Sequence, residues 1–174
     1  MMAAHDPADT THMAHHRDMV NTRLSPLVEA KEFREVFILR SDDGLVTFST
    51  DKIQEEKQMA GQPFFTHGRN RSYVQNVYYS MSLQQAAMTI ATPIRNLDGS
   101  IVAVLGAHLN LAALSDMVEK GRHIRPTQGT YLVNKFNYFI TEPRFGKAYA
   151  LKKAVHPQGV QRALAGNDGI GLYE

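Results

Sequence analysis

Apolar residues recur at near-helical spacing from Met13 to Leu27, with polar side chains between them. This period predicts a long helix that ends at about Arg23. Ser25-Pro26 interrupts the pattern, because proline has no amide hydrogen for the helical ladder. Ser25 can instead cap a second helix that has proline at its first position, so a short helix is expected over 26–33.

Short apolar or alternating runs then predict five strands. They cover 36–39, 45–49, 72–81, 88–94 and 101–109, and an Asp-Gly turn joins the first two and the last two. The charged segment 51–59 is expected to be helical, a short turn or helix to follow at 61–65, and an amphipathic helix over 111–120 to end at Gly121. This order predicts an α+β fold with a largely antiparallel sheet.

The chain then repeats its first hairpin. Residues 37–47 align with residues 131–141, since apolar triplets flank a polar turn in both and each stretch ends in Thr. A second domain of the same kind is therefore expected from Gly129. It holds a predicted helix over 156–165 and a turn at 166–169, and it lacks its final strands.

Composition narrows the classes of function. The 174 residues carry a net charge of +2, too small a surplus to indicate a nucleic-acid partner, and no cysteine, which excludes disulfides and thiol chemistry. The longest apolar run, 101–107, is far shorter than a membrane span. The first 20 residues hold four histidines and no apolar core of a signal peptide. The chain as given is expected to be soluble, with any membrane segments outside it.

Several motifs occur in an order typical of one family. After the hairpin come Ile-Ala-Thr-Pro-Ile at 90–94, Asp-Gly-Ser-Ile-Val-Ala-Val-Leu-Gly at 98–106, and Leu-Asn-Leu at 109–111 before a helix. From about residue 27 onward, the chain resembles the double Cache sensor domain, a tandem of PAS-like lobes found outside bacterial membranes.

The resemblance implies an organisation and a role. Residues 1–27 would form the N-terminal helix, 28–120 a membrane-distal lobe with the ligand pocket, and 121–174 an incomplete membrane-proximal lobe. The implied role is that of a periplasmic ligand-sensing domain of an inner-membrane receptor. A histidine kinase of a two-component system is the first choice, and a chemoreceptor or a diguanylate cyclase the alternative. A homodimer along the N-terminal helix is expected.

The family's ligand anchors are replaced in this sequence. Its Arg-x-Trp-Tyr-x-x-Ala motif falls on 62–68, where Gln62 stands for the arginine and Phe64-Phe65 for the aromatic pair; its later aspartate falls on His108. An α-amino-acid ligand held in the family's usual way is therefore not expected. Histidine in place of an acid, near two arginines, favours a neutral or anionic ligand such as a small carboxylate. The candidate ligand-binding residues are His108, Arg71, Tyr73, Arg69, Tyr79, Gln62 and Phe65.

Plainer interpretations stand beside these. The two arginines can be solvated loop charges, and His108 and the tyrosines can be core residues. Phe64 and Phe65 can fill the pocket, which would make the chain a protein-interaction module. His12, His15 and His16 have metal-ligand spacing, yet a polar helix start explains them better, so no metal or cofactor is predicted. No catalytic motif occurs, so no enzyme is predicted in this stretch.

Overall fold

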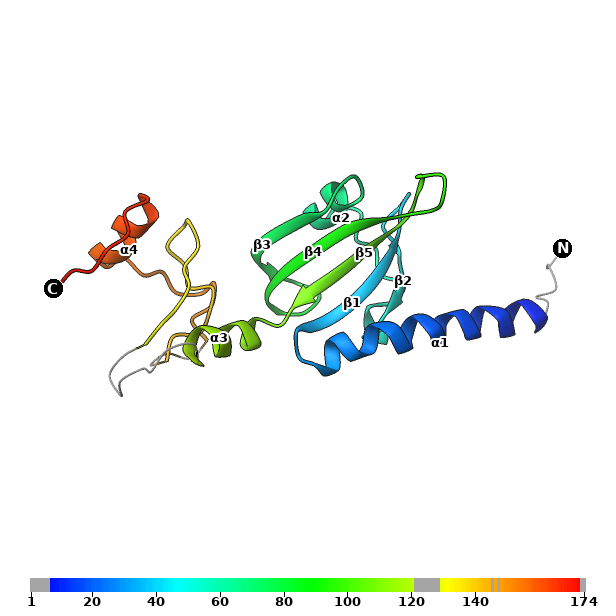
Figure 1. Cartoon of the computed structure of the whole chain (residues 1–174), viewed down its shortest axis with the longest axis horizontal. Helices are drawn as coiled ribbons and strands as arrows, with labels where there is room; N and C mark the ends of the chain where they lie inside the picture. The colour runs from blue at the N-terminus through cyan, green and yellow to red at the C-terminus, as the bar shows by residue number, and fades with distance from the viewer. Residues whose placement is uncertain (1–6, 121–128, 145, 147, 173–174) are drawn as a thin grey trace. The chain divides into compact units, whose positions relative to one another are not determined.

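The computed structural model describes the backbone of residues 7–120, 129–144, 146 and 148–172. Side chains are described from residue 14 onward and not at 119–120. The fold is α+β, as predicted, with one five-stranded sheet and several helices (Figure 1). Among the described helices, none has the length and apolarity needed to cross a membrane.

The elements follow the predicted order. The helices are α1 (Pro7–Glu29), α2 (Pro63–Gly68), α3 (Leu111–Lys120) and α4 (Gln158–Leu164), with a 3-10 turn η1 (Lys52–Gln54). The strands are β1 (Phe33–Arg40), β2 (Val46–Ser49), β3 (Tyr73–Ser80), β4 (Gln85–Arg95) and β5 (Ile101–Leu109). The five predicted strands are confirmed, and the bounds of β5 and α3 are those expected.

The break predicted at Pro26 was wrong, because α1 continues through it. Pro26 lies in the last turn, where its missing amide removes only the bond to the Thr22 carbonyl. The Pro26 carbonyl still accepts from the amide of Ala30 at 2.9 Å. Contact between α1 and β1 gives the helix packing that outweighs this local loss.

The helix predicted over 51–59 is also absent from the structure, which has only η1 there. The backbone of this segment pairs with β2 instead. The Val46 amide donates to the Lys57 carbonyl at 3.0 Å, and the Glu56 amide donates to the Val46 carbonyl at 2.9 Å. Glu56 has a φ of 65°, which an α-helix does not allow. Tertiary pairing has therefore overridden the helical propensity of the charged residues.

The strand order in the sheet is β2-β1-β5-β4-β3, and the register aligns side chains across three neighbouring strands. One row consists of Glu35, His108 and Thr89, and the next of Phe37, Gly106 and Ala91. Because alternate residues of a strand share a face, both rows lie on the same face of the sheet.

Helices pack on both faces of the sheet (Figure 1). On the face of the two rows, α2 approaches closely enough that a Cβ on Gly68 would lie 2.5 Å from the Cβ of Ala91. On the opposite face, α1 places the Arg17 guanidinium 5.8 Å from the centre of the Phe48 ring. Phe48 pairs with Ile38, whose side chain alternates with that of Phe37.

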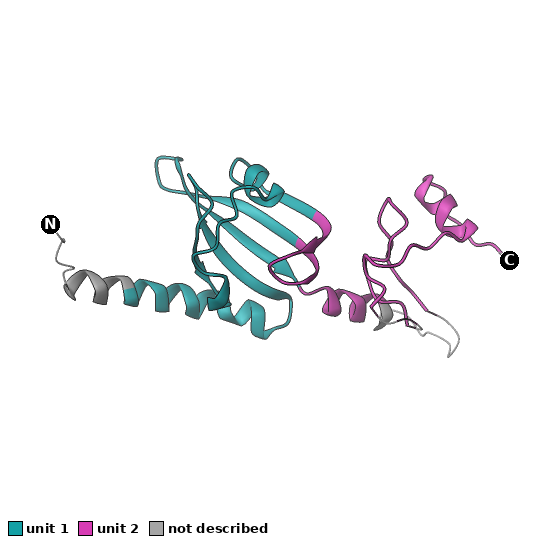
Figure 2. Cartoon of the chain, turned by 180° about the vertical axis from the view of Figure 1, so that it is seen from behind, with its two compact units in different colours: residues 1–75, 89–109 teal, residues 76–88, 110–174 magenta. Residues whose placement is uncertain are grey.

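The chain divides into two compact units (Figure 2). The first comprises Met1–Gln75 and Thr89–Leu109, and the second comprises Asn76–Met88 and Asn110–Glu174. Residues 76–88 and α3 were predicted to lie in the first lobe, whereas this division assigns them to the second unit. The predicted lobes of 28–120 and 121–174 therefore remain a prediction about family organisation.

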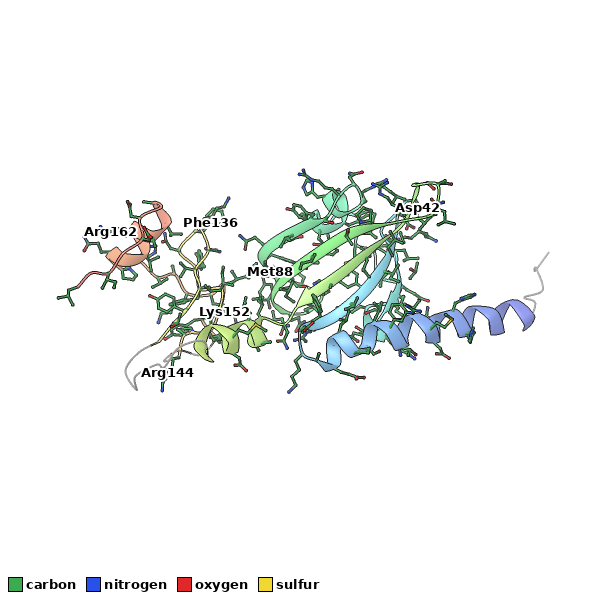
Figure 3. The ribbon with its side chains drawn as sticks, viewed as in Figure 1. Asp42, Met88, Phe136, Arg144, Lys152 and Arg162 are labelled. Atoms are coloured by element: carbon green, nitrogen blue, oxygen red, sulfur yellow. The ribbon has the colours of Figure 1, made fainter. Side chains whose placement is uncertain are left out.

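The repeated hairpin is visible in the hydrogen bonds. In the first copy, the Thr47 hydroxyl donates to the carbonyl of Ile38 at 3.2 Å. At the aligned positions of the second copy, the Thr141 hydroxyl accepts from the amide of Leu132 at 3.0 Å. Figure 3 shows Phe136 at the tip of the second hairpin. This copy forms isolated bridges among the described residues, so a complete second PAS-like lobe stays a prediction.

Gly106 provides a test of the packing between β5 and β1. A Cβ at this position would lie 2.2 Å from the buried ring of Phe37, so Gly106→Ala is expected to destabilise the fold by about 1–3 kcal/mol. Gly61→Ala is the matched control, because nothing lies within 4 Å of its added Cβ. Urea unfolding followed by circular dichroism measures both. Equal stability of the two variants would contradict the packing described here.

Candidate functional site

A row of polar side chains is buried in the middle of the sheet. Glu35, His108 and Thr89 retain 3%, 4% and 0% of their accessible surface. The Thr89 hydroxyl lies 2.7 Å from Nδ1 of His108, and Nε2 of the same ring lies 3.7 Å from Oε2 of Glu35. Buried polar groups cost free energy unless they are satisfied, so a row of this kind is an unusual feature for a sheet face.

An aromatic cluster covers this row. The Phe64 ring, from α2, meets the His108 ring edge-on, with centroids 6.1 Å apart. The Phe37 ring contacts both, at 5.8 Å from Phe64 and 4.9 Å from His108. Such edge and tilted geometries are those that aromatic rings prefer. His108 is therefore enclosed by Phe64 above and by its neighbours in the sheet.

The local sequence explains why Phe64 occupies this place. Pro63 occupies the first turn of α2, where a missing amide costs nothing. The Phe64 amide, free at this helix start, donates to Oε1 of Gln75 on β3 at 2.9 Å. The start of the short helix is thus tied to the sheet, and Phe64 is directed onto the buried row.

The acid and the imidazole in the row both favour their uncharged forms. Burial raises the pKa of Glu35 to about 7, and the Ser49 hydroxyl bond partly opposes that rise. Burial lowers the pKa of His108 to about 4, with a smaller contribution from the positive charge of Arg34. Between these values Glu35 carries a proton and His108 is neutral, so the pair holds one proton.

One oxygen of Glu35 is distinctive. Its Oε1 accepts from the Ser49 hydroxyl at 2.7 Å, whereas its Oε2 is buried and makes no hydrogen bond in the structure. Leaving a polar atom unsatisfied in the interior is costly, so such atoms are rare and are frequently functional. The imidazole of His108 lies beside this oxygen, with Nε2 3.7 Å from Oε2.

The structure distributes the predicted ligand residues over several environments. His108 and Phe65 are buried, Gln62 and Tyr73 are half-buried, and Arg69, Arg71 and Tyr79 are exposed. Gln62, Phe65 and Arg69 belong to α2 or its ends, and the Arg69 guanidinium lies 5.8 Å from the Phe65 ring. The Tyr73 ring stacks on His67, 4.6 Å between centroids.

The two tyrosines of β3 differ in their exposure. Burial alternates regularly from Tyr73 to Val77, and the alternation then shifts so that Tyr79 is exposed. Tyr73 and Tyr79 are separated by an even number of positions, so strict period-2 alternation would place both on one face of the strand. Because the alternation shifts between them, Tyr79 is exposed whereas Tyr73 is half-buried.

Glu35, Ser49 and Thr89 were not among the residues chosen from the sequence. A signal for Glu35 was present, because it alternates with Phe37 and so lies on the same face of the strand. A single charge on the inward face of a strand indicates a buried acid. Ser49 and Thr89 had no such signal, since their importance depends on register.

The structure describes the side chains of only two of the three histidines that have metal-ligand spacing. His15 and His16 are exposed, whereas the side chain of His12 lies outside the described residues. Among the side chains that the structure describes, no three His, Asp or Glu groups converge on a possible metal position.

Comparisons with known proteins give matches at the level of structure. The sequence matches no protein-family model and no curated protein. Among solved structures, the sensor domain of the V. cholerae histidine kinase DctB matches with a TM-score of 0.62 and 12% identity, over 88% of this chain and 58% of that one. The extracellular domain of the putative histidine kinase rpHK1S-Z16 matches with a TM-score of 0.57 and 16% identity, over 70% and 52%.

A chemoreceptor has the same architecture. The ligand-binding domain of the Pseudomonas aeruginosa chemoreceptor PctC, in complex with GABA, matches with a TM-score of 0.55 and 15% identity, over 87% of this chain and 62% of that one. The chain has the fold of Cache-type sensor domains. It spans a little more than half the length of the solved Cache-type domains that it matches, and at these identities the similarity establishes the fold alone.

The buried pair predicts a characteristic dependence of stability on pH. In His108→Gln only Glu35 titrates: between its ordinary pKa of 4.5 and about 7, the folded state holds one more proton than the unfolded state. Between about pH 4.5 and 6.5, where the two slopes of wild type cancel, the free energy of unfolding of this variant should fall relative to wild type by about 1.4 kcal/mol per pH unit.

Glu35→Gln should show the opposite sign. Between about pH 4 and the ordinary histidine pKa of 6.5, the unfolded state holds the extra proton, so the free energy of unfolding rises with pH, and from about pH 4.5 to 6.5 it rises relative to wild type. In wild type the two slopes cancel between about 4.5 and 6.5. Urea unfolding at half-unit pH intervals measures all three proteins. Parallel pH profiles would show that the pair does not titrate as described.

Proposed function

We propose that this chain is the periplasmic ligand-sensing domain of a bacterial inner-membrane histidine kinase of a two-component system. The observation that carries the proposal is the fold, which matches the DctB sensor domain over 88% of the chain. In this proposal the transmembrane and output segments lie outside the sequence, and the chain itself performs no chemistry. A chemoreceptor is the alternative output, supported by the match to PctC, and a diguanylate cyclase is a further one.

The proposed ligand is a small molecule that binds in the first unit, on the sheet face beneath α2. The residues proposed to contact it are His108, Gln62, Phe65, Arg69, Arg71 and Tyr73, whereas the remaining candidate from the sequence, Tyr79, belongs to the second unit. Because Phe64 encloses His108, a ligand can reach the imidazole only if the Phe64 ring moves aside. Ligand binding would therefore displace α2, and a ligand shifts an equilibrium only as far as it prefers one arrangement.

A carboxylate remains the proposed ligand class, and Glu35 places a condition on it. An anion next to His108 would also lie near Glu35, and two like charges in a buried site repel strongly. The carboxylate can bind there only while Glu35 keeps its proton. The exposed guanidinium groups of Arg69 and Arg71 provide positive charge at the end of α2.

The proposed receptor is a homodimer along α1. On the described part of α1, Met19 is nearly half exposed and can contribute to an interface between two copies. Signal output would then follow from a displacement of this helix relative to its partner.

A second function is favoured by one specific observation, the packing of Phe64 against His108 and Phe37. If this aromatic cluster is permanent, the chain is a protein-interaction module whose signal comes from a periplasmic protein. Both functions use the same fold, and ligand binding separates them.

A thermal-shift screen against small carboxylates, amino acids, amines, sugars and divalent metals tests the first function. A ligand at 100 times its dissociation constant stabilises the folded state by about 2.7 kcal/mol. The shift should disappear in His108→Gln and weaken in Arg71→Gln. It should persist in Arg23→Gln, which removes an exposed arginine from α1 instead. A well-folded wild type with no shift from any class would favour the protein-interaction module.

The condition set by Glu35 gives a further prediction for any carboxylate found in the screen. Its affinity should fall as the pH rises through about 7, because Glu35 loses its proton there. Glu35→Gln should remove this pH dependence while preserving binding. Titration calorimetry from pH 5.5 to 8.5 measures both proteins, and a pH-independent affinity in wild type would place the carboxylate away from Glu35.

A further inference from the structure

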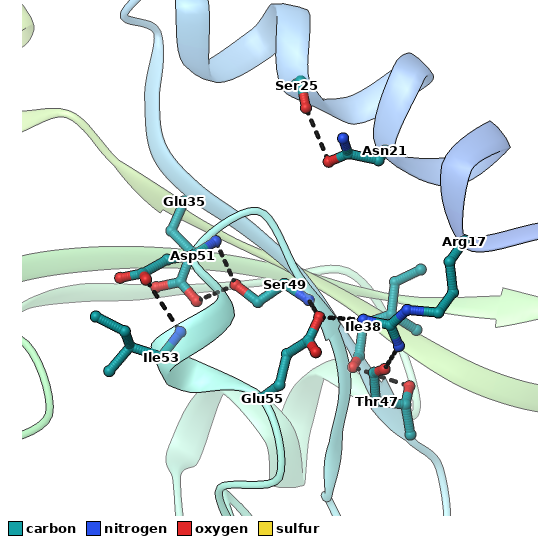
Figure 4. Close-up of polar contacts among 10 residues, drawn as sticks. All are labelled: Arg17, Asn21, Ser25, Glu35, Ile38, Thr47, Ser49, Asp51, Ile53 and Glu55. Carbon is teal, nitrogen blue, oxygen red and sulfur yellow. Dashed lines mark hydrogen bonds and ion pairs between the residues drawn. The ribbon is translucent and has the colours of Figure 1, made fainter. Parts of the chain in front are cut away.

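Ser49 connects the buried carboxyl group to the surface of the first unit (Figure 4). Its hydroxyl donates to Oε1 of Glu35 at 2.7 Å, and its amide donates to Oε1 of Glu55 at 3.1 Å. The same hydroxyl oxygen accepts from the amide of Asp51 at 3.0 Å. A change in the strength of the hydrogen bond between Ser49 and Glu35 would therefore affect the backbone of β2 and the start of η1.

Glu55 continues the path to α1. The oxygen that accepts from Ser49 also accepts from Nη2 of Arg17, at 2.5 Å. Arg17 also donates to the carbonyl of Thr47 at 3.0 Å and lies over the Phe48 ring. These contacts attach α1 to β2. Because the Arg17 side chain is about half exposed, the attachment is weak enough for a modest change at Glu55 to alter it.

The inner end of the path has two accessible charge states. Glu35 Oε2 has no hydrogen-bond partner and is 3.7 Å from Nε2 of His108, whose Nδ1 already contacts the Thr89 hydroxyl. A proton on Oε2 leaves both groups neutral, and its loss leaves a buried carboxylate. No rearrangement of the aromatic cluster is required for a proton to bind, in contrast to a larger ligand.

We propose that Glu35 and His108 form a proton-binding site that controls the attachment of α1 through Ser49, Glu55 and Arg17. This goes beyond the proposed sensing of a small molecule and requires no such ligand. When Glu35 loses its proton, its bond from Ser49 becomes charge-assisted, and such bonds are shorter and stronger. Ser49 is drawn toward β1, and the amide that it presents to Glu55 moves with it. The position of the Glu55 carboxylate relative to the Arg17 guanidinium then changes, and this alters their ion pair.

The charges that surround the site are consistent with titration near neutral pH. Asp51 opposes ionisation of Glu35, whereas Lys57 and Arg34 favour it, and burial is the largest influence. From α2 the facing side chain is the uncharged Phe64, and from β4 it is Thr89. Burial raises the pKa of Glu35 to about 7, so its carboxyl group changes charge near neutral pH.

The test is an NMR titration of the full chain from pH 4 to 9, with carboxyl-13C glutamate and 15N labels and no ligand added. Two imidazoles, those of His15 and His16, adjoin Arg17 in the sequence, so every sample carries His15→Gln and His16→Gln to remove them. The Glu35 carboxyl carbon should titrate with a midpoint near 7. The amides of Ser49 and of α1 residues near Arg17, such as Val20, should shift with the same midpoint.

Three variants locate the connection between Glu35 and α1. Arg17→Gln should abolish the α1 response while the Ser49 response remains, and Arg23→Gln, the matched control on α1, should preserve both. Glu35→Gln should abolish both; if it does not fold, the wild-type and Arg17→Gln titrations alone decide. A Glu35 midpoint near the ordinary 4.5, or an unchanged α1 response in Arg17→Gln, would overturn the proposal. Because no ligand is present, a negative ligand screen leaves this result unaffected.

Discussion

The antiparallel register of β1, β5 and β4 is the constraint on which the other features of the first unit depend. It aligns Glu35, His108 and Thr89 in one row and Phe37, Gly106 and Ala91 in the next. The second row is small at two of its three positions, so Phe37 can lie over Gly106 and α2 can approach Ala91. A shift of one residue would turn the polar row to the opposite face and separate it from α2.

The register also explains why the polar row is tolerated. Each member has a partner that depends on its alignment: the Thr89 hydroxyl for His108, and the Ser49 hydroxyl for Glu35. What remains unsatisfied is one carboxyl oxygen next to one imidazole nitrogen. An apolar row of similar volume would be less costly to bury, so this pair is not a source of stability for the sheet.

The sequence predicted most of the fold, because strands and turns left strong local signals. The Asp-Gly turns and the apolar run at 101–107 predicted the bounds of β2 and β5 almost to the residue. The errors arose where tertiary pairing overrode local preference, as when α1 continued through Pro26 and residues 51–59 paired with β2. The candidate site was harder to predict. His108 was found by its place in a motif, whereas Glu35 became its neighbour only through strand register.

Phe64 is where the proposed functions differ physically. Its ring seals the polar row from solvent, and this seal produces the shifted pKa values of Glu35 and His108. If α2 can swing away, the same movement admits a ligand, and an anion bound next to the pair would raise the pKa of Glu35 further by repulsion between like charges. Ligand entry and proton affinity are then coupled, and each must alter the other by the same factor. If the Phe64 ring stays over the polar row permanently, only protons can reach that row. A proton site and a sealed pocket are therefore compatible, whereas a small-molecule site requires that α2 open.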